Sequence, residues 1–167
     1  EDPLSHYLRV VADKTGSLIS ASARFGAMLS GASKEVIEIV TEFGEKIGVA
    51  FQLADDVIDI ASDSNQSGKT PGTDLKEGIP TLVTIRVMQS NDPKDSELKA
   101  LLAKPIHDEK TVEEVILKLR AHPALLESKV QLHEVANNAK KLLEVLPISP
   151  ARTALENLCS AIVNRSV

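Results

Sequence analysis

Three aspartates lie within five positions of the segment FQLADDVIDI, residues 51–60, in which most other side chains are apolar. If the segment is helical, Asp55 and Asp59 lie one above the other, because residues four apart share a face of an α-helix. Asp56 lies beside them, and Gln52 continues the polar stripe one turn earlier. Neighbouring carboxylates repel each other, so a bound cation would relieve them. Carboxylates without His or Cys suit Mg²⁺, which often bridges to phosphates, and the pattern therefore predicts a magnesium site.

The alternative is that the aspartates form an ordinary solvated face of the helix. The outer face of the same predicted helix is marked by charged residues, namely Glu35, Glu38, Glu42, Glu45 and Lys46. Asp55 and Asp59 are rotated from the centre of that face by about a quarter to a third of a turn. We therefore expect the acidic stripe to line a cavity.

Three lysines are candidates to bind phosphates near such a metal site. Lys69 lies in SGKTPGTD, residues 67–74, where two glycines allow the backbone to approach a ligand closely, and Lys76 follows it. The segment lacks the GxxxxGK[ST] pattern of a Walker loop. Lys14 and Thr15 place a cation and a hydroxyl within the first predicted helix, ahead of a glycine. Lysine is mostly exposed in proteins, so an ordinary surface position is the alternative for each of them.

Apolar residues at helical spacing run through most of the chain. We expect one helix, bent at a central glycine, over 4–29 and a long helix over 34–61. A loop rich in Ser, Gly and Pro follows over 62–74, and Pro80 opens a further helix that ends near Gln89. Prolines separate the remaining predicted helices, which cover 95–103, 110–121, 124–146 and 150–164. The pattern predicts one all-α domain over residues 1–167.

Composition limits the class of protein. Hydrophobic residues make up 43% of the chain and aromatic residues only 2%, which favours a helical core of Leu, Ile, Val and Ala. The net charge of −5, without a cluster of Lys and Arg, argues against a nucleic-acid partner. No apolar run approaches the roughly 20 residues needed to span a bilayer. The single cysteine, Cys159, fits a reducing compartment, so we expect a cytoplasmic protein without stable membrane insertion.

Three motifs resemble, in their order and spacing, the second half of a trans-polyprenyl diphosphate synthase, and especially the longer-chain bacterial enzymes. They are KTGSLI at 14–19, GVAFQLADDVIDI at 48–60 and GKTPGTDLKEGIPTL at 68–82. The resemblance implies the carboxyl-terminal part of an isoprenoid-synthase-type antiparallel helical bundle. It also implies a Mg²⁺-dependent prenyltransferase of isoprenoid biosynthesis, which condenses isopentenyl diphosphate with an allylic diphosphate and forms a homodimer.

The resemblance assigns the acidic residues to metal binding. Asp55, Asp56 and Asp59 correspond to the second aspartate-rich motif of the family, and Asp55 is the expected direct ligand of Mg²⁺. Asp74 matches an aspartate of the loop motif, where it would orient Lys69 or a metal-bound water.

The resemblance assigns the remaining candidates to the substrate and the chemistry. The lysines expected to bind the allylic diphosphate are Lys14, Lys69 and Lys76. Thr15 and Gln52 match positions thought to assist proton removal and cation stabilisation. Ionisation of an allylic diphosphate separates a carbocation from pyrophosphate, so cationic groups must neutralise the leaving group as its charge develops.

The family also has a first aspartate-rich motif and an isopentenyl diphosphate site ahead of the KTG motif, and this sequence contains neither. We therefore expect the chain to be about the carboxyl-terminal half of a prenyltransferase, inactive by itself and self-associating through apolar helix faces. Three alternatives remain open. They are a non-catalytic helical partner subunit of a heteromeric prenyl synthase, a fragment of a class I terpene cyclase, and a helical Mg²⁺-binding scaffold. The sequence does not define the product length or the preferred allylic substrate.

Overall fold

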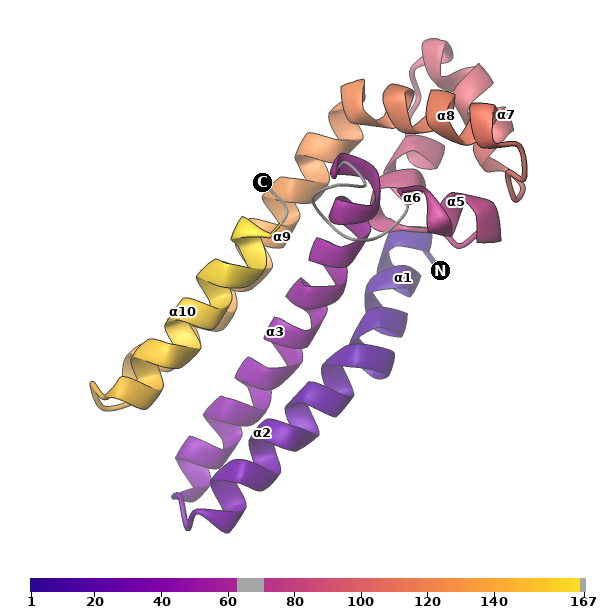
Figure 1. The fold of residues 1–167 in the computed structure, drawn as a ribbon. Helices are drawn as coiled ribbons and strands as arrows, with labels where there is room; N and C mark the ends of the chain where they lie inside the picture. Colours follow the sequence, from indigo (N-terminus) through magenta and orange to yellow (C-terminus); the bar gives the residue numbers. More distant parts are fainter. Residues whose placement is uncertain (63–70, 166–167) are drawn as a thin grey trace. The chain divides into compact units, whose positions relative to one another are not determined.

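The computed structural model describes residues 1–62 and 71–165, and this part of the chain is built from helices without strands (Figure 1). The elements are α1 (Pro3–Val11), the π-helical turn η1 (Ala12–Gly16), α2 (Ser17–Leu29), α3 (Lys34–Ala61), α5 (Thr73–Glu77), α6 (Leu82–Gln89), the 3₁₀ turn η2 (Pro93–Asp95), α7 (Ser96–Leu102), α8 (Glu109–Ala121), α9 (Pro123–Leu142), the 3₁₀ turn η3 (Leu143–Val145) and α10 (Pro150–Asn164). The predicted all-α class is confirmed.

The described residues form two compact units. The first unit contains Glu1–Tyr7 and Asp55–Val130, and the second contains Leu8–Ala54 and Gln131–Arg165. Helices α1, α3 and α9 therefore each contribute residues to both units. The expected single domain over residues 1–167 stays a prediction.

In the second unit, η1 and α2 lie directly against α3. Gly31 lies between α2 and α3 and has a φ of 75°, a conformation that favours glycine. Glycines on α3 make the contact between these segments possible. A Cβ atom on Gly48 would lie 2.8 Å from Cα of Gly16, and one on Gly44 would lie 2.9 Å from Cα of Ser20. The backbones meet without side chains between them, which fixes η1 on α3.

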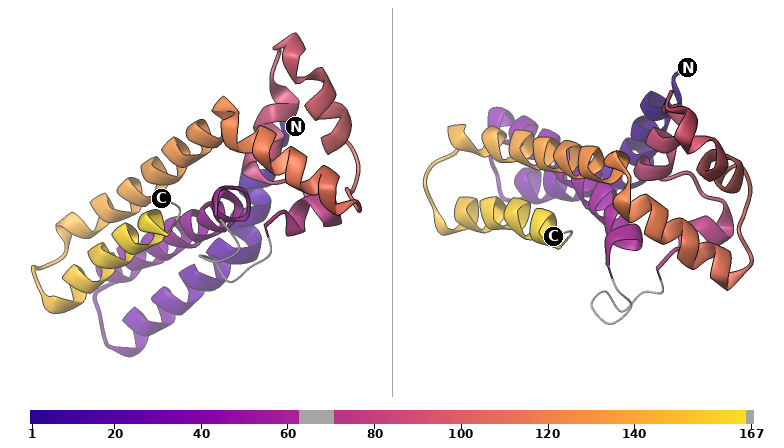
Figure 2. Two further views of the ribbon diagram at one scale, coloured as in Figure 1. Left: turned by 45° about the horizontal axis from the view of Figure 1, so that its top comes forward. Right: turned by 90° about the horizontal axis from the view of Figure 1, so that it is seen from above.

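The second unit also contains α10, which folds back beside α9 (Figure 2). The hydroxyl of Ser149 accepts a hydrogen bond from the Arg152 amide and caps the start of α10. Buried residues of α9, η3 and α10 in this unit are Leu132, Ala136, Ala139, Leu143, Cys159, Ile162 and Val163. Cys159 is buried and packs as a small apolar side chain. Its burial raises the pKa of its thiol.

The first unit has a core formed by the end of α3, by α5 to α8 and by the start of α9. Its buried residues are Val57, Ile60, Leu75, Val83, Val87, Leu98, Ile106, Val112, Val115, Ile116, Leu119, Ala124 and Leu125. Arg120 on α8 donates hydrogen bonds to the carbonyl oxygens of Ile60 and Ser62, each at 2.8 Å. The last carbonyl groups of a helix have no partner within it, so these contacts hold the end of α3 in place.

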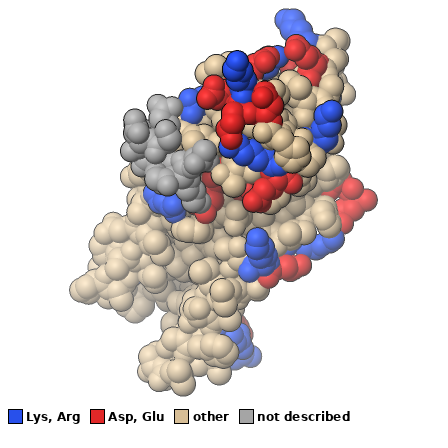
Figure 3. All heavy atoms as spheres, turned by 45° about the vertical axis from the view of Figure 1, so that its right-hand side comes forward, with Lys and Arg blue, Asp and Glu red and all other residues tan. Residues whose placement is uncertain are grey.

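Charged side chains of opposite sign lie close together on the face drawn in Figure 3. On α8, for example, the ammonium of Lys118 lies 3.0 Å from a carboxylate oxygen of Glu114. Such interspersed charge is typical of an ordinary solvated surface. None of the helices in residues 1–62 and 71–165 is long and apolar enough to cross a membrane.

Helix α2 differs from the charged helices because its large apolar side chains are exposed. Leu18, Phe25 and Leu29 are 67%, 59% and 89% exposed. Exposed apolar faces of this kind favour association with another surface. The expected self-association of the chain stays a prediction.

Candidate functional site

Lys14 and Thr15 lie in the π-helical turn η1 of the second unit. Turns of this kind interrupt α-helices and are frequent at functional sites. Lys14 is exposed, whereas Thr15 is partly buried. The Thr15 hydroxyl donates a long hydrogen bond, 3.4 Å, to Oε1 of Gln52 on α3. The structure thus brings together the two residues that the family resemblance links to proton removal and cation stabilisation.

Asp55, Asp56 and Asp59 occupy the last turns of α3, in the first unit. Asp55 is partly buried, while Asp56 and Asp59 are only 4% and 7% exposed. Glu38 and Glu45, at the predicted outer face of the same helix, are exposed. A solvated helix face is therefore wrong for Asp56 and Asp59, and Asp55 is only partly accessible.

The carboxylate of Asp56 binds two partners within the first unit. Its Oδ2 accepts a hydrogen bond of 2.5 Å from the Tyr7 hydroxyl and one of 3.0 Å from the amide of Leu82, the first residue of α6. Burial, and then the charge of Asp56, raise the pKa of the Tyr7 hydroxyl, so it stays protonated and donates. Sequence reasoning missed both partners because they lie 49 and 26 positions from Asp56.

Asp55 and Asp59 share one face of α3. Asp56 projects about 100° from Asp55 around the helix axis. Carboxylate oxygens are the donors that Mg²⁺ and Ca²⁺ prefer, so the residues of this face fit a hard divalent cation. In the described ranges no three His, Cys, Asp or Glu side chains form a group able to hold a metal ion. A cation bound here would complete its coordination with water and phosphate oxygens, as Mg²⁺ usually does.

The chain that follows the undescribed residues 63–70 returns to the end of α3. The amide of Gly72 donates to the backbone oxygen of Asp59 at 3.2 Å. Gly72 and Gly78, with φ of 79° and 70°, flank the short helix α5, in which Asp74 is the second residue. This contact attaches α5 to the acidic stripe. Lys69, the predicted diphosphate ligand of this motif, lies outside the described residues.

Lys76 on α5 forms an ion pair with α8. Its Nζ lies 2.8 Å from Oε1 of Glu109, whose side chain is 73% exposed. Exposed ion pairs contribute about 0–1 kcal/mol, so this pair can be exchanged for another anion at small cost. The expected binding of diphosphate by Lys76 stays a prediction.

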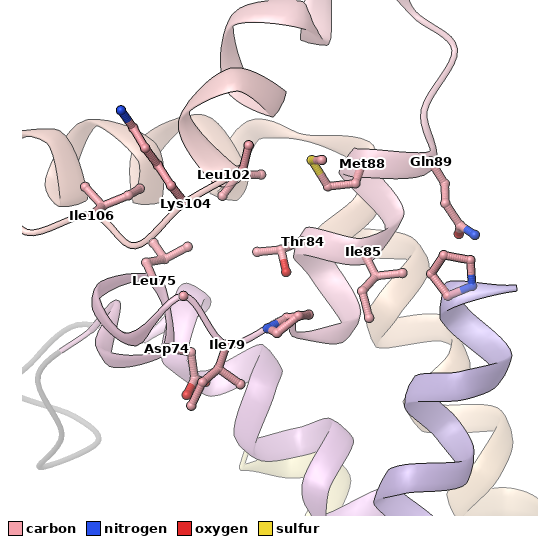
Figure 4. Close-up of a pocket in the computed structure, with 14 residues that line it drawn as sticks. Asp74, Leu75, Ile79, Thr84, Ile85, Met88, Gln89, Leu102, Lys104 and Ile106 are labelled. Atoms are coloured by element: carbon pink, nitrogen blue, oxygen red, sulfur yellow. The ribbon is translucent and has the colours of Figure 1, made fainter. Parts of the chain in front are cut away.

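A cavity of about 370 Å³ lies beside α5 and α6 in the first unit (Figure 4). Leu75, Ile85 and Leu102, from three different helices, contribute to its mainly apolar wall, and Asp74 lies at its edge. The lining residues do not include the three aspartates of α3. The expectation that the acidic stripe lines a cavity therefore stays a prediction.

Comparison with known proteins identifies close relatives. The model of the family described as Polyprenyl synthetase matches residues 1–119. The chain is 43% identical over 164 residues to the nonaprenyl diphosphate synthase of Mycobacterium tuberculosis, covering 98% of this chain and 49% of that protein. It is 32% identical over 160 residues to the octaprenyl diphosphate synthase of Escherichia coli, covering 96% and 50%. The chain thus spans about half the length of these relatives.

A solved structure shows that the similarity to these synthases extends to the fold. The geranylgeranyl pyrophosphate synthase of Corynebacterium glutamicum, complexed with calcium and isoprenyl diphosphate, matches this chain with a TM-score of 0.92 and 36% identity. The match covers 99% of this chain and 51% of that one. The predicted fold, part of an isoprenoid-synthase-type helical bundle, is confirmed. The family model, the sequence relatives and the fold agree, and the chain belongs to the polyprenyl synthetase family.

Proposed function

We propose that this chain provides the part of a prenyltransferase that binds the allylic diphosphate for condensation with isopentenyl diphosphate. The observation that carries the proposal is the placement of Asp55 and Asp59 one turn apart on α3, with Asp55 partly buried and Asp59 7% exposed. The similarity to a synthase solved with calcium and isoprenyl diphosphate supports it. Because the chain spans about half of its relatives, we expect no turnover by this chain alone.

The carboxylates of α3 are the proposed ligands of a divalent cation. Asp55 is the proposed direct ligand, Asp59 shares its face of the helix, and Asp56 completes the motif. We favour Mg²⁺ because the ligands are hard oxygen donors and because Mg²⁺ commonly binds substrate phosphates. When bound, such a cation neutralises charge that develops on a leaving diphosphate.

The proposed contacts to the diphosphate are made by lysines. Lys14 is exposed on η1 and is accessible to an anionic ligand. Lys76 is a further proposed diphosphate ligand, provided that its ion pair with Glu109 is exchanged for the diphosphate. The roles of Lys14 and Lys69 rest on the family motifs.

Thr15 and Gln52 are proposed to act after ionisation. The Thr15 hydroxyl donates a hydrogen bond to Gln52. The oxygen of that hydroxyl can still accept a hydrogen bond from another group. The two side chains thereby present oxygen atoms rather than charged groups. Such oxygen dipoles stabilise a carbocation without forming a covalent bond to its carbon atom. They can also receive or relay the proton that the carbocation loses.

Thermal unfolding provides the test of the proposed binding function. Mg²⁺ and pyrophosphate together, at about 100 times the dissociation constant, are expected to stabilise the chain by about 2.7 kcal/mol. For a protein of this size the unfolding midpoint should rise by about 5–10 °C. Mg²⁺ alone or pyrophosphate alone should raise the unfolding midpoint much less, because each needs the opposite charge of the other to bind tightly at the site.

The same titration distinguishes the alternatives. Equal stabilisation by Mg²⁺ with and without pyrophosphate would favour a magnesium-binding scaffold. No stabilisation by the two ligands together would contradict the proposed diphosphate site. Calcium with pyrophosphate serves as a second cation with the same preference for oxygen ligands.

A further inference from the structure

Asp56 is the most deeply buried aspartate of the motif, and its carboxylate is bound by two other segments of the first unit. It is 4% exposed, and its Oδ2 accepts hydrogen bonds from Tyr7 at 2.5 Å and from the Leu82 amide at 3.0 Å. Tyr7 belongs to α1 and Leu82 opens α6. One oxygen atom therefore joins three segments that are far apart in the sequence.

The contact with α6 satisfies a group that the helix cannot satisfy itself. The first amide groups of a helix have no partner within it, and the positive end of the helix dipole favours a carboxylate there. In α6, the Thr81 hydroxyl accepts from the Thr84 amide, and Asp56 accepts from the Leu82 amide. Asp56 thus completes the cap of α6, and the Tyr7 hydroxyl donates to the same oxygen of Asp56.

This link restrains the rotation of the last turns of α3 about the helix axis. Asp55 immediately precedes Asp56, and Asp59 follows three residues later, so both project in directions set by the orientation of the helix. Rotation of α3 by roughly 20° would move a carboxylate at about 6 Å from the axis by roughly 2 Å. Mg²⁺ demands near-ideal octahedral geometry, and a binding site must be held within about 0.5 Å. A rotation of this size would therefore weaken the binding of the cation.

We propose that Tyr7 is a positioning residue for the metal-binding face of α3 and acts through Asp56, which is an internal anchor and not a metal ligand. The inference rests on the proposed binding of a divalent cation and diphosphate by Asp55 and Asp59. It limits the proposed metal ligands to Asp55 and Asp59, whereas the family resemblance implies all three aspartates. Tyr7 contacts neither cation nor substrate in this account.

Calorimetric titration of the 167-residue chain with Mg²⁺ and pyrophosphate tests the inference. Tyr7→Phe keeps the ring and removes only the donating hydroxyl. It is expected to weaken the affinity about tenfold, whereas Asp55→Ala should abolish binding. Asp56→Ala removes the oxygen that accepts both hydrogen bonds and is expected to act like Tyr7→Phe. Because both changes break the same link, the double variant should lose little more than either single variant.

A control variant separates positioning from general stability. Leu98→Ala removes buried volume from α7 in the core of the first unit, at a residue with no part in the proposed link. It should lower the unfolding midpoint and leave the affinity for Mg²⁺ and pyrophosphate unchanged. Circular dichroism verifies that each variant is folded, and Asp56→Ala carries the test if Tyr7→Phe does not fold.

The outcomes are distinct. Wild-type affinity in folded Tyr7→Phe would overturn the inference and leave the proposed function intact. Complete loss of binding in folded Asp56→Ala, equal to that in Asp55→Ala, would show that Asp56 is a direct ligand and would also overturn it. Absence of binding in the wild-type chain would contradict the proposed function itself, and the inference would fall with it.

Discussion

Replacement of Asp55 by Ala is expected to lower the rate of prenyl transfer by about 10²–10³-fold, the usual effect of removing one group that stabilises charge in a transition state. The assay mixes the present chain with the half of the Mycobacterium tuberculosis nonaprenyl diphosphate synthase that it does not match. The reaction is followed with radiolabelled isopentenyl diphosphate and a short allylic diphosphate. The chain alone should give no product.

The physical reason lies in the position of Asp55. It is the most accessible carboxylate of the motif, being partly buried while Asp56 and Asp59 are buried. Loss of its charge removes the proposed direct ligand of the cation, and the leaving diphosphate is then poorly neutralised. Asp55→Asn should give an intermediate loss, since an amide oxygen is a weaker ligand than a carboxylate.

Glu42→Ala is the matched control for this substitution. Glu42 is an acidic residue of the same helix, exposed at its outer face and paired with Lys46 at 3.3 Å. Its loss should change the rate little. If the mixture transfers prenyl groups equally well with Asp55→Ala, the partner half carries the chemistry and this chain is a non-catalytic subunit. A cyclised hydrocarbon product would favour the terpene cyclase alternative.

Gly48→Ala is expected to destabilise the chain by about 1–2 kcal/mol, although alanine normally favours a helix over glycine by about 1 kcal/mol. The added Cβ would lie 2.8 Å from Cα and 3.2 Å from the backbone nitrogen of Gly16 in η1. Backbone atoms cannot move aside as a flexible side chain can, so η1 and α3 must separate. The displacement would also move Thr15 away from Gln52, which should lower the rate of transfer.

Gly26→Ala provides the control for helix propensity. Gly26 lies in α2, and no atom outside its own helical backbone lies within 4 Å of the position of an added Cβ. This change should stabilise the chain by about 0.5–1 kcal/mol. Urea unfolding measures both variants, with the slope of the transition expected to stay constant. A Gly48→Ala chain as stable as the wild type would contradict the close contact between η1 and α3.

Much of the fold follows from local patterns. The long helix expected over 34–61 is observed as Lys34–Ala61, because its apolar periodicity is sustained over many turns. The helix expected over 4–29 contains a π-helical turn at Ala12–Gly16, which depends on contact with α3 and leaves no periodic signal. The five-residue α5 begins at the end of the loop expected over 62–74, is too short to show a period and is defined by its flanking glycines.

Element boundaries depended on capping that the sequence shows only weakly. The helix expected from Pro80 begins instead at Leu82, because Thr81 is its N-cap and forms a capping box with Thr84 in the first turn. The helix expected over 124–146 ends as an α-helix at Leu142 and continues as a 3₁₀ turn. Such terminal tightening is common where a helix approaches a following proline.

The candidate site was predictable where it depends on one helix and unpredictable where it depends on tertiary contacts. The shared face of Asp55 and Asp59 follows from helical geometry alone. The inward carboxylate of Asp56 does not, because its partner Tyr7 is 49 residues away. The pairing of Lys76 with Glu109, across 33 residues, is another contact that local pattern cannot reveal.

The central claim is that the acidic face of α3 binds a divalent cation together with diphosphate. A crystal of the chain grown with Mn²⁺, which replaces Mg²⁺ and scatters anomalously, and with pyrophosphate tests it directly. We predict an anomalous peak within about 2.0–2.6 Å of carboxylate oxygens of Asp55 or Asp59, with pyrophosphate oxygens completing the coordination. Anomalous peaks only at other positions, at ligand concentrations that saturate the thermal shift, would contradict the account.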